Sequence, residues 1–388
     1  MSLLRSRKHA APHGALPLLA ALASLPLAAQ TAPAKPVSEK PAEEREMQEV
    51  KVKARREVPF KADTSASTKL TQPLLETPKT IQVVKKEMLQ EQGAATLMEA
   101  LRNTPGITMQ LGENGNSSAG DTFQMRGFST QASTFVDGIR DMGAVTRDVF
   151  NLEQVEIVKG PAGAETGRAS SSGYLNLVTK LPRRDAITEA VLTGGTAQRK
   201  RFTADLGRAF GDTGAFRLNV MAQDSGVDGR DLVKNKGRAV APAVAFGLGT
   251  GTRLFLSSQH LKQDNVPDGG IPTVGFPGFT SADPRLAQAP KVDVKSFYGA
   301  RGDRERVDAD LFTGRLEMDL APGTTVRSLT RYGRTHMDRV MTGVYSVNVP
   351  TDDPATWTVT RLRQRQDQTN EILANQTGVT TTLSLIHI

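Results

Sequence analysis

The feature that most constrains this chain is a two-residue alternation of apolar and polar side chains, which begins near Ile187 and continues to residue 382. Successive side chains of a β-strand point to opposite faces, so this period predicts strands with one apolar and one polar face. Short turns such as 321–324 and a long polar stretch at 266–295 separate the candidate strands. The clearest alternating stretches are 201–206, 216–223 and 312–320.

Two architectures fit this alternation. One is an outer-membrane sheet with its apolar face toward lipid and its polar face inward. The other is a soluble antiparallel sandwich with one wet face. Beyond the N-terminal region, no run approaches the roughly 20 apolar residues of a membrane helix. The alternation alone does not separate the two architectures.

The composition excludes several classes of site. The chain has no cysteine, which excludes disulfide scaffolds, zinc–thiolate sites and cysteine nucleophiles. It has five histidines, and only His260 and His336 lie away from the ends, too few for a metal cluster. The net charge of +8 is dispersed and does not indicate nucleic-acid binding.

The N-terminus predicts export. Basic residues at 5–8 precede an apolar run at 16–29, a pattern typical of a signal peptide, here expected to span 1–29. Residues 30–59 are too polar to bury a core and are expected to be a disordered linker. This linker holds a short alternating segment that could pair with the sheet edge of another protein. Its residues are Glu49, Val50, Lys51, Val52 and Lys53.

The first folded unit is expected at 60–182, where the pattern becomes mixed α and β. Residues 80–84 predict a strand and 85–92 a helix that Gly93 ends. Thr96 and Glu99 have the spacing of a capping box at the start of a second helix. Glycines near 160–167 are not followed by the Gly-Lys-Ser/Thr of a phosphate-binding loop, so that reading is rejected.

Six segments of this unit carry a family resemblance. TPKTIQVV, LRNTPGI, QMRGF, FVDGIR, NLEQVEIVKGPAGAETG and GYLNLVTKLP occur in this order. The order resembles that of the plug domain of TonB-dependent siderophore receptors. The run RGFSTQASTFVDGIRDMGAVTRD is most similar to the catecholate branch of the family.

The resemblance implies the fold class: an α+β plug domain at 60–182, followed at 183–382 by the first strands of a transmembrane antiparallel β-barrel. Intact transporters of this kind have about 22 strands, whereas we count eight or nine candidates here, too few to close around a plug. The chain is therefore expected to be a fragment. Residues 383–388 are expected to be a non-native tail, since the family ends on an aromatic residue.

The resemblance also implies a function. The chain is expected to belong to a receptor in the outer membrane of a Gram-negative bacterium that imports ferric siderophores of the catecholate type. Residues 49–53 correspond to the TonB box, so TonB with its inner-membrane complex, the siderophore and outer-membrane lipid are the expected partners. No catalysis and no cofactor are expected, because the iron arrives already chelated.

The expected ligand contacts are arginine and aromatic side chains at the outer mouth, since ferric catecholates are anionic with aromatic rims. A structural role in the plug is the alternative for each, and for Arg126 specifically a buried salt bridge. The candidates are Arg126, Gln131, Arg140, Met142, Arg147, Phe297 and Tyr298.

Two departures from the family bear on the ligand. Gly269 and Thr273 stand where relatives often carry aromatic residues, in a loop that could touch ligand. Receptors of the same architecture for haem, cobalamin or an oligosaccharide therefore remain alternatives. A secreted β-sandwich that binds or adheres is a third interpretation.

Overall fold

The computed structural model describes residues 60–112, 119–167 and 170–382. The predicted signal peptide, the linker with residues 49–53 and the predicted tail at 383–388 lie outside these residues. Within the described part, no helix is long and apolar enough to cross a membrane.

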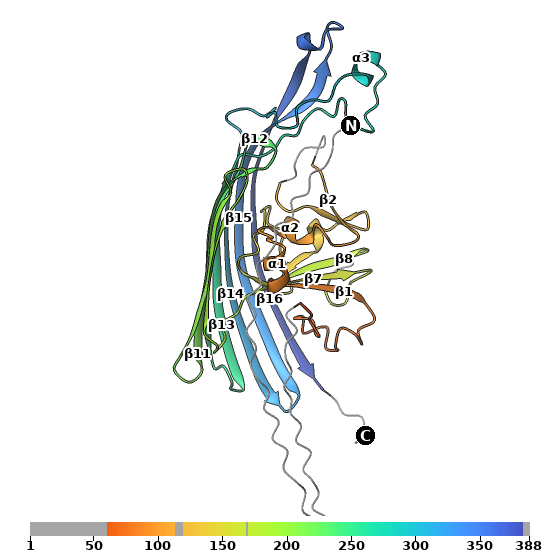
Figure 1. Cartoon of the computed structure of the whole chain (residues 1–388). Coiled ribbons are helices and arrows are strands. Elements are labelled where there is room, and N and C mark those ends of the chain that lie inside the picture. Colours follow the sequence, from red (N-terminus) through yellow and green to blue (C-terminus); the bar gives the residue numbers. More distant parts are fainter. Residues whose placement is uncertain (1–59, 113–118, 168–169, 383–388) are drawn as a thin grey trace, which may run out of the picture. The chain divides into compact units, whose positions relative to one another are not determined.

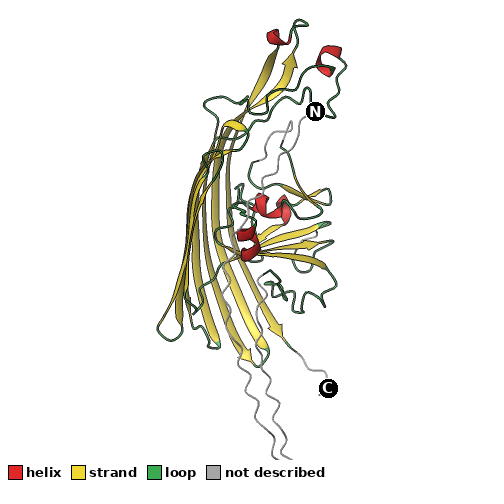
Figure 2. Ribbon diagram, in the orientation of Figure 1, coloured by secondary structure: helices red, strands yellow, loops and turns green. Residues whose placement is uncertain are grey.

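The described part of the plug domain consists of short strands and two short α-helices (Figures 1 and 2). Strands β1, β7, β8, β5 and β6 form one sheet in that order, and β2, β3 and β4 form a second. The elements in chain order are β1 (Thr80–Lys85), α1 (Lys86–Glu91), α2 (Leu97–Leu101), β2 (Ile107–Met109), β3 (Phe123–Met125), β4 (Phe128–Ser129), the 3-10 turn η2 (Gln131–Ser133), β5 (Thr134–Val136), β6 (Ile139–Arg140), β7 (Leu152–Lys159) and β8 (Gly173–Thr179).

Local sequence explains how the plug helices begin. The Thr96 side chain accepts a hydrogen bond from the Glu99 backbone N–H at 3.2 Å, while the Glu99 carboxylate accepts from the Thr96 N–H. This confirms the predicted capping box, which satisfies backbone donors that a helix start leaves free. The helix that follows turns Leu97 and Leu101 into the plug core, where both are fully buried beside Leu175 of β8.

The second half of the chain forms one antiparallel sheet of eight strands, each paired with its neighbours in chain order (Figure 1). This agrees with the eight or nine strands expected, and the sandwich interpretation is wrong because the strands form a single sheet. The strands are β9 (Ile187–Gly194), β10 (Lys200–Phe210), β11 (Gly214–Val227), β12 (Arg230–Phe246), β13 (Thr252–Asn265), β14 (Arg304–Ala321), β15 (Thr324–Asn348) and β16 (Thr358–Thr381), with α3 (Pro284–Ala287) and the 3-10 turn η3 (Pro354–Thr356) in loops.

The two faces of this sheet differ as the alternation predicts. On the outward face Phe216 and Phe312 are 41% and 47% exposed. On the inward face Arg217, Asp205 and Asn219 are almost fully buried against the plug. Most apolar side chains therefore face away from the plug, the arrangement of a barrel wall in lipid. The inward face is mainly polar, with an apolar patch that includes Met221 and Met337 where it meets residues 144–150 of the plug.

The two ends of the sheet also differ. Short turns join β10 to β11, β12 to β13 and β14 to β15 at one end, which we call the short-turn end. At the other, the long-loop end, residues 266–303 join β13 to β14 and residues 349–357 join β15 to β16. Outer-membrane barrels place short turns in the periplasm and long loops outside the cell.

A segment without regular structure, residues 60–79, precedes β1, and we call it the strap. The Ser65 hydroxyl and the Ala66 N–H donate to one carboxylate oxygen of Glu156 at 3.0 and 2.6 Å. Glu156 lies on β7 and is 1% exposed. Further along, Lys79 forms an ion pair with Glu165. The strap is thus attached to the plug through a buried carboxylate.

Candidate functional site

The plug loop at 141–147 runs along the inward face of the sheet toward the long-loop end. The β5–β6 turn, just before it, is bound by Arg331 of β15. Gly143 sits against Thr335, further along the same strand, where an added Cβ would lie 2.8 Å from the threonine hydroxyl. Thr146 accepts a hydrogen bond from Gln263, close to the long-loop end of β13. The loop is therefore a part of the plug that extends along the sheet toward the outer mouth.

Arg147 holds this loop in place. Its guanidinium donates to Asp141 at 3.1 and 2.9 Å, to Asp121 at 3.3 Å and to the Gly143 carbonyl at 3.2 Å. The side chain is 11% exposed. These bonds give Arg147 the structural role that was the alternative to ligand contact, because its donors are directed into the plug.

The two carboxylates around Arg147 differ in their titration. Burial raises the pKa of Asp121 to about 6, against the opposing charge of Arg147. Burial acts in the same sense on Asp141, but there the Arg147 charge and hydrogen bonds prevail and lower its pKa. One oxygen of Asp121 is also buried without a partner among the described residues. Asp121 is therefore the less stable anion of the pair.

Arg140 and Met142 lie next to this anchored loop. An Arg140 terminal nitrogen contacts the Met142 sulfur at 2.6 Å, and the Met142 side chain is 53% exposed. The Arg140 Nε is buried and has no hydrogen-bond partner among the described residues. Gln131 is exposed in the 3-10 turn before β5. A cation beside an exposed, polarisable apolar group is suited to an anionic ligand with an apolar rim.

Arg126 has a different environment. It is exposed at the β3–β4 turn with φ of 52°, so the buried salt bridge considered for it is wrong. Its backbone N–H donates to the Gly106 carbonyl at 2.9 Å. Burial and then the Arg126 charge lower the pKa of Lys159, which shows that the two cations are neighbours. Arg126 thus belongs to the end of β7 rather than to the loop at 141–147.

Phe297 and Tyr298 lie in the long loop between β13 and β14, as expected. Both are half-buried. Arg361 of β16 donates to the Gly299 carbonyl at 2.9 Å and so fastens this part of the loop to the sheet. The Tyr298 carbonyl also accepts from Arg361, so the backbone beside these aromatic residues is held by β16 at the long-loop end.

Thr342 of β15 explains two further residues of this long loop. A Cβ on Gly269 would lie 2.0 Å from the Thr342 carbonyl oxygen, so glycine is required there by a close backbone approach. Asp303 is buried and accepts from the Thr342 N–H and hydroxyl at 2.9 and 2.8 Å. Asp303 therefore fastens the end of this loop to β15.

Buried ion pairs join the plug to the sheet, and sequence reasoning did not find them. Arg201 of β10 binds both oxygens of Asp148 at 2.6 Å. Arg331 donates to Asp137 at 2.8 Å and is 4% exposed. The alternation places these arginines on the inward face, but it gives no signal for their partners in the plug. In the described part of the chain, no group of three or more His, Cys, Asp or Glu residues could hold a metal ion.

Comparison with known proteins identifies the family. Residues 73–174 match the family model of the TonB-dependent receptor plug domain. With this plug and the antiparallel sheet beside it, the chain belongs to the TonB-dependent siderophore receptors, and its sheet is a wall of an outer-membrane barrel.

The individual relatives are siderophore receptors. The catecholate siderophore receptor Fiu of Escherichia coli is 43% identical over 326 residues, which are 82% of this chain and 43% of Fiu. The probable TonB-dependent siderophore receptor PiuA of Acinetobacter baumannii is 34% identical over 346 residues, 88% of this chain and 44% of PiuA. The crystal structure of E. coli Fiu in its closed form matches with a TM-score of 0.81 and 42% identity, covering 84% of this chain and 47% of that one. The chain spans less than half the length of these relatives.

Proposed function

We propose that this chain is the plug and first barrel wall of an outer-membrane receptor that imports ferric catecholates into the periplasm. The observation that carries the proposal is the 43% identity to a catecholate receptor over 326 residues. The receptor transports and does not catalyse. Its iron enters as a finished complex, so the protein supplies no metal ligands and no cofactor.

The chemistry of the plug loop supports this ligand class. A ferric catecholate presents negative charge and aromatic rims. Arg140 offers a guanidinium to the charge, and the exposed Met142 offers a polarisable surface to the rings. Phe297 and Tyr298 at the long-loop end and Gln131 in the turn before β5 are proposed as further contacts, and Arg126 as a more distant one. Arg147 contributes indirectly, because it holds the plug loop at 141–147 in position.

Import in this proposal depends on TonB. The box at Glu49–Lys53 lies shortly before the strap, which is attached to the buried carboxylate of Glu156. A pull on the box therefore acts on the plug through the strap. Ligand outside and TonB inside bind two separate sites with a movable element between them, which is the requirement for allosteric coupling.

Uptake by a receptor of full length tests the proposal. Residues 1–382 are joined in strand register to the C-terminal strands of E. coli Fiu, and we call this chimera the completed receptor. It is produced in iron-starved cells that lack their own catecholate receptors. We expect uptake of the ⁵⁵Fe complex of 2,3-dihydroxybenzoate, and no uptake of a ferric hydroxamate.

Two variants separate the parts of the mechanism. Deletion of residues 49–53 should abolish uptake and leave binding at the cell surface intact. Arg140→Gln should weaken that surface binding about tenfold, whereas Arg140→Lys should recover part of it. A completed receptor that reaches the outer membrane and takes up haem, cobalamin or an oligosaccharide in place of the catecholate complex contradicts the proposal.

A further inference from the structure

A cavity of about 780 Å³ lies between the plug and the inward face of the sheet, near the short-turn end. The strap around Lys69, the β5–β6 turn, β8 and the strands β14–β16 form its walls. Arg327 and Leu329 line it, and both are closer to the short-turn end of β15 than Arg331, which binds the plug. The cavity is thus nearer the short-turn end than the Arg331 contact, whereas the loop at 141–147 is bound by Gln263 near the long-loop end. Its volume is in the range of small-molecule sites.

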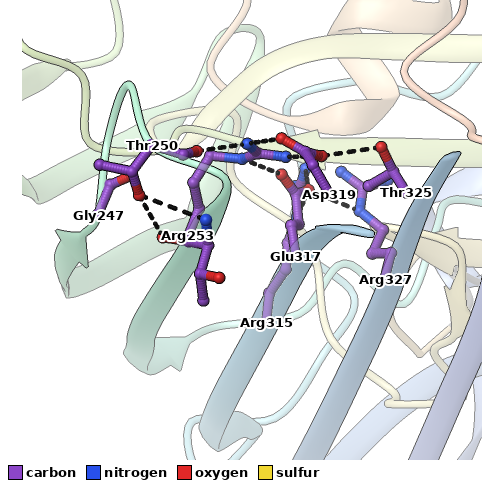
Figure 3. Close-up of polar contacts among 9 residues, drawn as sticks. Gly247, Thr250, Arg253, Arg315, Glu317, Asp319, Thr325 and Arg327 are labelled. Atoms are coloured by element: carbon purple, nitrogen blue, oxygen red, sulfur yellow. Dashed lines mark hydrogen bonds and ion pairs between the residues drawn. The ribbon is translucent and has the colours of Figure 1, made fainter. Parts of the chain in front are cut away.

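Two arginines in this cavity keep donors that no group among the described residues accepts. Arg315 of β14 and Arg327 of β15 both donate through Nε to the same oxygen of Glu317, at 2.7 and 2.9 Å (Figure 3). Arg315 also donates one terminal nitrogen to this carboxylate. The other terminal nitrogen of Arg315 and both of Arg327 have no partner among the described residues. One carboxylate therefore orients two guanidinium groups and leaves three terminal nitrogens available.

Arg253, in the same cluster, provides the contrast. It donates to Glu317 at 3.2 Å, to both oxygens of Asp319 at 2.6 and 2.9 Å and to the Thr250 carbonyl at 2.8 Å (Figure 3). Arg253 does not line the cavity. Its bonds hold the β12–β13 turn against β14. The cluster thus contains one arginine used for structure and two with donors to spare at the cavity.

The charge around the cavity is positive. Lys69, Arg315 and Arg327 line it, against two carboxylates, Asp137 and Glu165. Arg331 pairs with Asp137 and Lys79 pairs with Glu165, and neither of these cations lines the cavity. These two carboxylates are therefore neutralised from outside. Glu317, also outside the lining, offsets one charge of the Arg315–Arg327 pair, so the field within stays positive through Lys69 and the remaining guanidinium charge.

The plug side of the cavity carries aromatic residues. Phe135 and Tyr174 both line it, with their ring centroids 5.6 Å apart in an edge-to-face arrangement. Arg315 lies over the Phe255 ring, 5.3 Å from its centroid, which fixes the guanidinium plane. Oriented guanidinium groups opposite aromatic edges suit a planar aromatic anion.

We propose that this cavity is a second site for the ferric catecholate, occupied after the complex has passed the outer loop of the plug. Arg315 and Arg327 bind its anionic oxygens, and Phe135 and Tyr174 contact its rings. The inference rests on the proposed function for the class of ligand, and adds a site on the periplasmic side of the plug.

Equilibrium dialysis of the purified completed receptor in detergent tests the second site, with the ⁵⁵Fe complex of 2,3-dihydroxybenzoate as the probe. We expect two binding equivalents per receptor. In Arg315→Gln/Arg327→Gln the weaker equivalent should have a Kd raised at least tenfold, while the tighter one is unchanged. Arg253→Gln is the matched control and should retain both equivalents, because Arg253 does not reach the cavity.

The outcomes separate this inference from the proposed function. One equivalent in the unsubstituted receptor, or a second equivalent that the double variant leaves unchanged, overturns the second site and keeps the proposed function. An equal loss in Arg253→Gln and in the double variant assigns the whole cluster a structural role and also overturns the site. Absence of any binding overturns both proposals. Arg327→Lys, which preserves the charge, should keep the second equivalent and so distinguishes lost charge from misfolding.

Discussion

The interior of the plug and its contact with the sheet are held by different forces. The interior is apolar, with Leu97, Phe123, Ile157 and Leu175 at 0–1% exposure. The contact with the sheet includes an apolar patch at 144–150 of the plug, but it depends on buried ion pairs such as Arg201–Asp148. Apolar burial stabilises without direction, whereas a buried ion pair gains little net free energy after its desolvation cost. The apolar interior therefore stabilises the plug by itself, whereas the ion pairs between the plug and the sheet add little net stability and can be broken at a smaller cost.

The largest expected effect comes from the plug interior. Phe123→Ala should lower the free energy of unfolding of the plug by about 4 kcal/mol, through lost burial and the cavity left behind. Hydrogen exchange at β7 and β8 of the completed receptor measures it. Leu75→Ala, in the strap where the side chain is 89% exposed, is the control and should change exchange little. Equal protection in both variants would show that the interior is not what holds the plug together.

The next effect concerns the wall. Asp148→Ala leaves the Arg201 guanidinium buried without its carboxylate and should weaken plug attachment by about 3 kcal/mol. Hydrogen exchange at residues 144–150 reports it. The double variant Arg201→Met/Asp148→Leu should regain most of the loss, because no charge is then left unpaired. If the double variant is as weak as the single one, the ion pair itself stabilises the attachment and the contrast between the two regions fails.

A smaller effect is expected where the plug helix begins. Thr96→Ala removes the capping oxygen from the Glu99 N–H and should cost about 1 to 2 kcal/mol, seen as faster exchange in α2. Thr96→Ser keeps the oxygen and serves as the control. If exchange also becomes faster in β15, the plug interior and the sheet unfold together, which contradicts the separation between the two regions.

The smallest effect is a pH dependence at the outer loop. The pKa of Asp121 is about 6 in the folded plug, above the ordinary value of 3.8. Its protonation therefore favours the folded state below the ordinary pKa, and this contribution is lost as pH rises through 6. Between pH 7 and pH 5 the loop should gain about 1 kcal/mol, measured by exchange at residues 141–147 after correction for intrinsic rates. Asp121→Asn should flatten this profile, and an unchanged profile would assign the dependence to another group.

Local patterns predicted much of the fold. The capping box at Thr96 and the alternating strands depend on neighbours within a few residues or on a regular period, and both are read directly from the sequence. The inward direction of Arg315 and Glu317 follows from the same period. Contacts between residues far apart in the sequence have no such pattern and were not predicted. The pairing of Arg147 with Asp121, 26 residues earlier, is one of them.

The candidate site was less predictable for the same reason. The sequence alone presents Gly269 as the loss of an aromatic residue. The backbone that passes close to it belongs to Thr342, more than 70 residues later in the chain. Arg147 had the residue type of a ligand contact, and only its three-dimensional partners reveal a structural role. Whether an arginine N–H group already has an acceptor depends on residues that only the three-dimensional fold brings together, so a sequence pattern does not reveal it.

The attachment of the strap to Glu156 has a mechanical consequence. A load applied at residue 60 reaches first the bonds of Ser65 and Ala66 to Glu156, then the bonds of Lys69 and Lys79 to Glu165. Only then does it reach Thr80, where β1 begins its pairing with β7. Bonds loaded one after another yield at a smaller force than bonds that share the load. A modest pull therefore detaches the strap first and then separates β1 from β7, while the apolar interior of the plug is still intact.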